Sequence, residues 1–392
     1  MRKKNNENKL MSVLAFMSLS IGIWSKYRQL WLQEVGYSIT GISKILSVSL
    51  ICSSIIAFFL SLFSHKIKVK NIVVLSLVLR TFSMICLLLV KTSFLIKSCI
   101  LLGIMCEVIF SIAFYPLLSF ESKSNNAYKR KMLIEYVFKD VGIVFCGLMI
   151  GVSLGEFVFD YNWCLIISIL ASLISFLLIM PYKGSEERFK KPDSLKASLR
   201  DIFYNKINRT FLCSQVVCYI SYGIVFDLMM LILTNYLGFD VTFTSIFIIV
   251  SNLFGTIFSF LFSKTSSSYS VALSAVIKYG SRAIFYILAF LINKNILFIF
   301  AIIYAIIMSR VMEDKVTGTF VEMIDEKNQF LYGNLRYFAM SLGEGIGAFL
   351  AGVLISNSLR ILFLGAGIMT IIQTSVFIYL NKLRKDKKLV DF

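Results

Sequence analysis

Long apolar segments alternate with short polar ones along the whole chain. Twelve of these segments stay apolar over about 20 residues, the length that an α-helix needs to cross the hydrocarbon core of a bilayer. They begin near Leu10, Ile39, Asn71, Lys97, Val141, Trp163, Phe211, Val241, Val271, Ile296, Gly333 and Ile361. The pattern predicts an all-α integral membrane protein with twelve transmembrane helices.

The second half of the chain repeats the first. Ser20-Ile21-Gly22-Ile23 matches Ser221-Tyr222-Gly223-Ile224 at an offset of 201 residues, and Tyr136, Gly142 and Gly151 match Tyr337, Gly343 and Gly352 at the same offset. A shorter match pairs the segment from Leu75 to Arg80 with the segment from Leu273 to Lys278. Repeated membrane halves are typical of secondary transporters that bind their substrate between the halves.

A polar stretch divides the two halves. Residues 1–181 and 210–392 form the predicted six-helix halves, and residues 182–209 form a linker that contains Pro192. A short amphipathic helix is expected at Leu195 to Ile207, lying on the membrane surface. No segment outside the membrane is long enough to fold as a catalytic domain, so we expect no enzyme activity.

Composition and charge placement agree with a membrane protein. Apolar residues make up 58% of the chain and charged residues 16%, whereas a soluble domain has about a quarter charged residues. If the N-terminus is cytoplasmic, the cytoplasmic segments hold 28 of the 40 Lys and Arg residues and the opposite loops hold four. This bias predicts a plasma-membrane protein with both termini in the cytoplasm. The net charge of +18 then reflects contact with anionic lipid, above all at Lys382 to Lys388, and we expect no nucleic-acid partner.

One loop motif and the helix count resemble the major facilitator superfamily of transporters. The family signature between helices two and three, Gly-x-x-x-Asp-Arg-x-Gly-Arg-Arg/Lys, corresponds here to the segment from Ser61 to Lys70. His65 takes the place of the aspartate and Lys66 that of the arginine, while Lys70 keeps the final base. The resemblance covers nearly the whole chain and implies twelve helices in two pseudo-symmetric halves around a central cavity. Loss of the acidic residue weakens the charge network by which this loop closes the inner gate in the family.

The fifth predicted helix lacks a motif that is common in the drug antiporters of this superfamily. Those antiporters carry a Gly-Pro pair there, whereas this helix contains Gly142, Gly147 and Gly151 without a proline. Small residues allow membrane helices to pack closely, so we assign these glycines to packing. The same holds for the glycines of the eleventh helix.

Charged residues inside apolar helices point to function, because each is costly in a membrane unless it is paired or faces water. Glu107 and Glu344 fall near the middle of their helices and are predicted to couple transport to protons. Gating or structural roles are expected for His65, Lys66, Arg80, Lys278, Arg282 and Arg310. Glu107 is the first candidate for the proton site, and its alternative role is that of a buried partner for Arg80.

Lys26 and Asp227 form a second candidate pair. They occupy equivalent positions in helices one and seven, which in the resembled fold face each other across the cavity. Opposite charges there predict either a pair that opens on binding of substrate or proton, or a static bridge.

Other residue types exclude several functions. All eight cysteines lie in apolar segments without metal-ligand spacing, and His65 is the only histidine, so we expect no metal and no cofactor. The sequence therefore predicts a monomeric secondary transporter that exports a drug-like or amphipathic small molecule in exchange for protons. A proton-coupled importer and a transport-inactive sensor or immunity protein remain alternatives.

Overall fold

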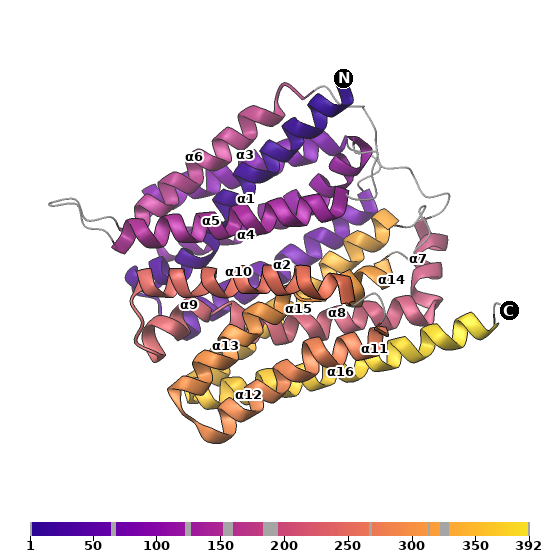
Figure 1. The fold of residues 1–392 in the computed structure, drawn as a ribbon. Helices are drawn as coiled ribbons and strands as arrows, with labels where there is room; N and C mark the ends of the chain where they lie inside the picture. The colour runs from indigo at the N-terminus through magenta and orange to yellow at the C-terminus, as the bar shows by residue number, and fades with distance from the viewer. Residues whose placement is uncertain are drawn as a thin grey trace. The chain divides into compact units, whose positions relative to one another are not determined.

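The structure is a computed structural model, and it describes residues 2–63, 68–121, 127–151, 160–182, 195–265, 269–312, 314–321 and 329–390. These residues form helices that divide into two compact units. Unit 1 consists of residues 1–190 and 238–246, and unit 2 consists of residues 191–237 and 247–392. Figure 1 shows the helices along the chain, and each unit is described by itself below.

Unit 1 contains six long helices. They are α1 (Arg2–Glu34), α2 (Ile39–Phe63), α3 (Val69–Leu89), α4 (Ser93–Glu121), α5 (Ala127–Gly151) and α6 (Tyr161–Ile179). Helix α1 packs against α5 and α6, and α3 packs against α4 and α6. Helix α6 is thus a shared neighbour of α1 and α3.

Unit 2 is also helical, but several of its helices are divided into shorter segments. They are α7 (Leu195–Tyr204), α8 (Lys206–Phe226), α9 (Met229–Leu231), η2 (Ile232–Tyr236), α10 (Val241–Thr265), α11 (Val271–Ala275), η4 (Val276–Gly280), α12 (Ser281–Ile292), α13 (Asn295–Arg310), η5 (Asp314–Gly318), α14 (Thr319–Val321), α15 (Gln329–Asn357) and α16 (Leu359–Val390). The first residues of α10 are grouped with unit 1. Helix α8 packs against α15 and α16, as α1 packs against α5 and α6 in unit 1.

Within the described residues, ten helical segments are long and apolar enough to cross a membrane. Two of them are compound: residues 206–236 join α8, α9 and η2, and residues 271–292 join α11, η4 and α12. The shorter apolar helix α13 and the helix α5 lie at the positions of the tenth and fifth predicted spans. The all-helical membrane architecture predicted from the sequence is therefore confirmed.

Several helices begin before the apolar run that they contain. Helix α5 begins at Ala127 instead of near Val141, because the polar residues before Val141 continue the helix and include the Lys139–Glu135 ion pair (2.6 Å) one turn apart. The seventh span begins at Lys206 rather than near Phe211, since the Asn205 side chain caps it by accepting from the backbone N–H groups of Ile207 and Asn208. The amphipathic helix of the linker is present as α7.

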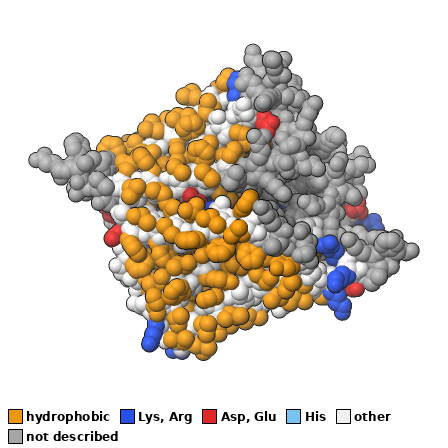
Figure 2. Space-filling view, viewed as in Figure 1, with side chains coloured by type: hydrophobic (Ala, Val, Ile, Leu, Met, Phe, Trp, Pro, Cys, Tyr) orange, Lys and Arg blue, Asp and Glu red, His pale blue; other side chains and the backbone are white. Residues whose placement is uncertain are grey.

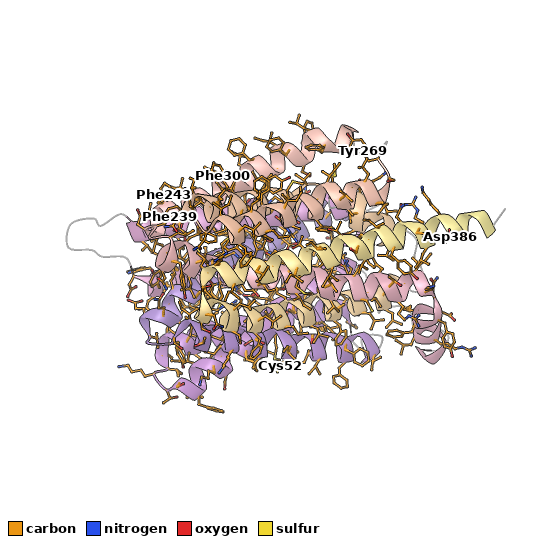
Figure 3. All side chains as sticks on the ribbon, turned by 90° about the horizontal axis from the view of Figure 1, so that it is seen from below. Cys52, Phe239, Phe243, Tyr269, Phe300 and Asp386 are labelled. Carbon is orange, nitrogen blue, oxygen red and sulfur yellow. The ribbon has the colours of Figure 1, made fainter. Side chains whose placement is uncertain are left out.

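The outer faces of the helices suit a lipid environment. Figure 2 shows hydrophobic side chains over most of the visible described surface, and the visible Lys and Arg side chains lie mainly at its margins. Phe243 and Phe300, labelled in Figure 3, are each half exposed, and Phe94 is 78% exposed. Exposed apolar surface on this scale is unusual for a soluble monomer and typical of helices that face acyl chains.

Glycines allow the helix pairs of each unit to approach closely. A Cβ atom at Gly142 would lie 2.7 Å from the Leu19 carbonyl oxygen of α1, and one at Gly343 would lie 2.3 Å from the Val216 carbonyl oxygen of α8. Both distances are too short for any side chain, so the backbones of α5 and α15 contact their neighbours directly. These matched glycines of the repeat have the packing role that the sequence indicated.

Candidate functional site

The interior of unit 1 holds a buried ion pair. The guanidinium of Arg80 on α3 is fully buried, and its Nε and Nη2 atoms each lie 3.2 Å from Oε1 of Glu107 on α4. The Glu107 side chain is 16% exposed. A buried arginine without such a partner would be strongly destabilising, so Glu107 has the role of partner for Arg80 that the sequence allowed.

Two serines extend this pair to neighbouring helices. Arg80 Nη1 donates to Ser20 Oγ of α1 at 2.6 Å, and the hydroxyl groups of Ser20 and Ser168 lie 2.8 Å apart. Ser168 belongs to α6, and its hydroxyl also donates to the Ser20 carbonyl at 2.8 Å. The network thus joins α1, α3, α4 and α6 in the interior of unit 1.

A second arginine borders the same region. A small enclosed cavity of about 10 Å³, room for at most one water molecule, is lined by Arg28, Arg80 and Glu107 together with Trp24, Ser83, Met84, Leu87, Cys99, Ile100 and Gly103. Two guanidinium groups therefore share the surroundings of one carboxylate.

Unit 2 contains the counterpart of this network, centred on Arg282 of α12. Arg282 Nη2 lies 3.5 Å from Ser221 Oγ of α8, and the hydroxyl groups of Ser221 and Thr370 lie 2.6 Å apart. Ser221 corresponds to Ser20 in the repeat, Thr370 to Ser168 and Arg282 to Arg80, at offsets of 201 or 202 residues. The partner of Arg282 is Gln373 Oε1 of α16, at 3.3 Å, where unit 1 uses a carboxylate.

The counterpart of Arg80 in the repeat is therefore Arg282, and not the residue that the sequence match indicated. The shorter match pointed to Lys278, four residues before Arg282. Lys278 instead lies on the π-helical segment η4, and its Nζ donates to the Ser309 carbonyl at 3.0 Å. Four residues make about one helical turn, so the match identified the buried face of the helix but not the turn.

A mixed cluster of charges surrounds Tyr222 in unit 2. The Tyr222 hydroxyl interacts electrostatically with the carboxyl groups of Glu344 and Asp227 and with the guanidinium groups of Arg310 and Arg282. Its ring stacks on Phe226 with centroids 4.4 Å apart. The cluster therefore brings together four of the residues that the sequence selected, around a tyrosine that it did not select.

Lys26 and Asp227, the second candidate pair, belong to different units. Lys26 is half-buried on α1 in unit 1, and Asp227 is half-buried just after α8 in unit 2. Arg310 Nη1 donates to Thr256 Oγ1 at 3.0 Å. His65 and Lys66 lie outside the described residues. Across the ranges that the structure describes, no three metal-ligand side chains come together.

Sequence reasoning missed the uncharged members of these networks. Ser20 and Ser221 lie within the matched segments, so the repeat itself could have selected them. Ser168, Thr370 and Gln373 gave no comparable signal, because hydroxyl and amide groups are frequent in membrane helices. Arg336, whose Nε donates to Gln215 Oε1 at 3.1 Å, was missed among the charges inside the helices.

The family model of the Major Facilitator Superfamily matches residues 10–313, which is most of the chain. The chain belongs to the major facilitator superfamily. A comparison with curated protein sequences gives no match. Membership of this superfamily makes the chain a multi-pass membrane protein of a transporter family rather than one of an enzyme family.

Solved structures of the superfamily share the fold. The nucleoside transporter NupG is similar with a TM-score of 0.72 and 13% identity, covering 96% of this chain and 99% of NupG. A bacterial homologue of the human lysosomal transporter Spinster, in an inward-facing and unoccupied conformation, has a TM-score of 0.74 and 13% identity, with 97% of each chain covered. An auto-inhibited peptide transporter of the POT family has a TM-score of 0.70 and 9% identity over 97% of each chain. At these identities the likeness establishes the fold alone.

Proposed function

We propose that the protein is a secondary active transporter of the plasma membrane that exports a drug-like or amphipathic small molecule in exchange for protons. The transporter fold and the superfamily match support transport by alternating access of the two halves. The observation that carries the coupling part of the proposal is the cluster around Tyr222. It combines two carboxyl groups, two guanidinium groups and a hydroxyl at membrane depth.

The two charge clusters differ in their suitability for proton coupling. In unit 1, Glu107 is the ion-pair partner of the fully buried Arg80, so protonating Glu107 would remove the negative charge that this arginine faces. In unit 2, Glu344 and Asp227 both act electrostatically on the Tyr222 hydroxyl, as do Arg310 and Arg282. Glu344 is therefore our first candidate for the coupling site, with Asp227 second and Glu107 third.

Aromatic side chains on α8 support an aromatic or amphipathic substrate. Tyr219, Tyr222 and Phe226 form a continuous row, with ring centroids 5.8 Å apart for the first pair and 4.4 Å for the second. Tyr219 and Tyr222 are half-buried. Flat faces and hydroxyl groups together suit a molecule with an apolar ring and a polar substituent.

Lys26 and Asp227 complete the proposed machinery. Their equivalent positions in the repeat support a charge pair that opens when substrate or proton binds. Arg80, Lys278 and Arg282 are assigned structural roles, because each has a buried side chain held by groups of its own unit. Arg310 lies in the Tyr222 cluster and is assigned the role of counter-charge to its acids.

The experiment that tests this function is growth of an expressing strain on a panel of toxic compounds. We expect improved survival for at least one amphipathic cation or neutral aromatic compound, together with lower cellular accumulation of that compound. Accumulation that rises on expression would favour the proton-coupled importer instead. Wild-type behaviour of a Glu344→Gln and Asp227→Gln double variant in this assay would favour a transport-inactive sensor.

A further inference from the structure

A groove lies on the surface of unit 2 between α8 and α16. It has a volume of about 480 Å³ and is lined by Arg209, Thr210 and Cys213 of α8 and by Ile371, Ile372, Ser375, Val376 and Tyr379 of α16. Most of these side chains are exposed, including Cys213 and Tyr379. The groove lies on the outside of the unit and shares no residue with the Tyr222 cluster.

The lining changes from polar to apolar along the groove. Arg209 and Tyr379 lie at one end, where the start of α8 meets the later part of α16 (Figure 1). The opposite end is formed by Ile371, Ile372 and Cys213. From residue 371 to 379 a helix rises about 12 Å, most of the roughly 15 Å of hydrocarbon in one leaflet. A ligand that fits this gradient has a polar head and an apolar tail of leaflet length.

The polar end is positively charged. Lys206, one turn before Arg209, places its Nζ 5.7 Å from the centroid of the Tyr379 ring. Arg200 on α7 and Lys382 and Lys385 near the end of α16 are exposed beyond the same end of these helices. Figure 3 shows this end of α16 reaching beyond its neighbours at Asp386. A negatively charged head group therefore complements this end of the groove.

We propose that this groove binds one anionic phospholipid, with its phosphate at Lys206 and Arg209 and one acyl chain along Ile371 and Ile372. Thr210 and Ser375 lie between these ends, where the glycerol and ester groups of the lipid would be. Basic residues at a membrane surface attract anionic head groups, and the apolar groove adds a contact that a flat surface lacks. The proposal does not depend on which substrate is transported.

Native mass spectrometry of the detergent-purified full chain tests the proposal with phosphatidylglycerol and phosphatidylcholine of identical acyl chains. We expect one phosphatidylglycerol to bind the wild type more tightly than phosphatidylcholine. The Lys206→Gln/Arg209→Gln variant should lose roughly tenfold or more of this affinity, since each basic residue near an anionic surface contributes a factor of about five. Equal binding of the two lipids by the wild type would overturn the proposal.

A matched control separates the groove from general charge attraction. Lys97 lies 5.8 Å from the centroid of the Tyr37 ring, much as Lys206 lies over Tyr379, and both Lys97 and Lys91 are exposed. The Lys91→Gln/Lys97→Gln variant removes the same charge and should bind phosphatidylglycerol like the wild type. An equal loss of affinity in both double variants would contradict a specific site.

A substitution that fills the apolar end of the groove tests the acyl-chain contact separately from the head-group contact. Cys213→Trp keeps both basic residues but occupies the apolar end, and it should weaken phosphatidylglycerol binding by a similar factor. Unchanged binding would show that the lipid binds to the charged surface alone, and it would overturn the proposal of a groove site. If this variant does not fold, as judged by its melting temperature, Ile372→Trp replaces it. Glycerol phosphate, which has no acyl chain, should not compete; effective competition would show an anion site instead of a lipid site.

Discussion

Arg80 and Arg282 make equivalent contacts in the two halves of the protein. Arg80 Nη1 lies 2.6 Å from Ser20 Oγ, and Arg282 Nη2 lies 3.5 Å from Ser221 Oγ. The halves differ in the group that faces the arginine, since Glu107 carries a negative charge and Gln373 does not. Glu107 therefore balances the charge of Arg80 in unit 1. In unit 2, Gln373 does not balance the charge of Arg282, which also acts on Tyr222.

The Arg80–Glu107 pair predicts an asymmetric response to removal of either partner. Glu107→Met should destabilise the protein by roughly 3–5 kcal/mol, because it leaves the fully buried Arg80 unpaired. Arg80→Met should cost less, because Glu107 is 16% exposed whereas Arg80 is fully buried. Melting curves in detergent measure both effects. The double variant should be more stable than Glu107→Met, and a double variant that is less stable than both single variants would argue against the pair.

The glycine contacts predict a second effect on stability. Gly343→Ala should separate α15 from α8 and cost roughly 1–3 kcal/mol, because the new Cβ would overlap the Val216 carbonyl oxygen. Gly333→Ala in the same helix is the control, since among the described residues no atom outside its own helical backbone lies within 4 Å of its Cβ position. Thermal unfolding should show that variant at or slightly above the wild type. Equal melting temperatures for the two variants would exclude close packing at Gly343.

Charge bias predicts the topology. A reporter fused after Phe392 or inserted between Ser185 and Ser194 should be cytoplasmic, and one inserted between Gly155 and Asn162 should be external. The prediction depends on the 28 Lys and Arg residues of the segments assigned to the cytoplasm. A cytoplasmic signal from the Gly155 insertion would require a different number of spans.

The proposed Lys26–Asp227 pair predicts rescue by exchange. Lys26→Ala or Asp227→Ala alone should abolish transport, because each removes one member of the proposed switch. Exchange of the two residues, Lys26→Asp with Asp227→Lys, should restore folding and part of the transport. Transport assays on all four proteins form a double-mutant cycle. Purely additive losses would mean that the two side chains do not interact.

Much of this architecture follows from the sequence for clear physical reasons. Helices that face lipid must be long and apolar, so their number and order were predictable, and the glycines of the repeat identified close helix contacts. Helix starts such as Ala127 were not predictable from hydropathy, because ion pairs like Lys139–Glu135 allow polar residues to continue a helix. The Arg282 contact was missed because a shift of one turn leaves a residue on the same face. Tyr222 was missed because its repeat partner is Ile21, so the match carried no chemical signal.

The most direct measurement is substrate accumulation in proteoliposomes driven by an imposed pH gradient, for the wild type, Glu344→Gln and Glu107→Gln. Glutamine mimics a permanently protonated carboxyl group. We expect Glu344→Gln to bind substrate but to show no accumulation in response to the gradient, and Glu107→Gln to retain accumulation in proportion to its folded fraction. Accumulation by Glu344→Gln at the wild-type rate, with complete loss in folded Glu107→Gln, would contradict the assignment and place the proton at Glu107.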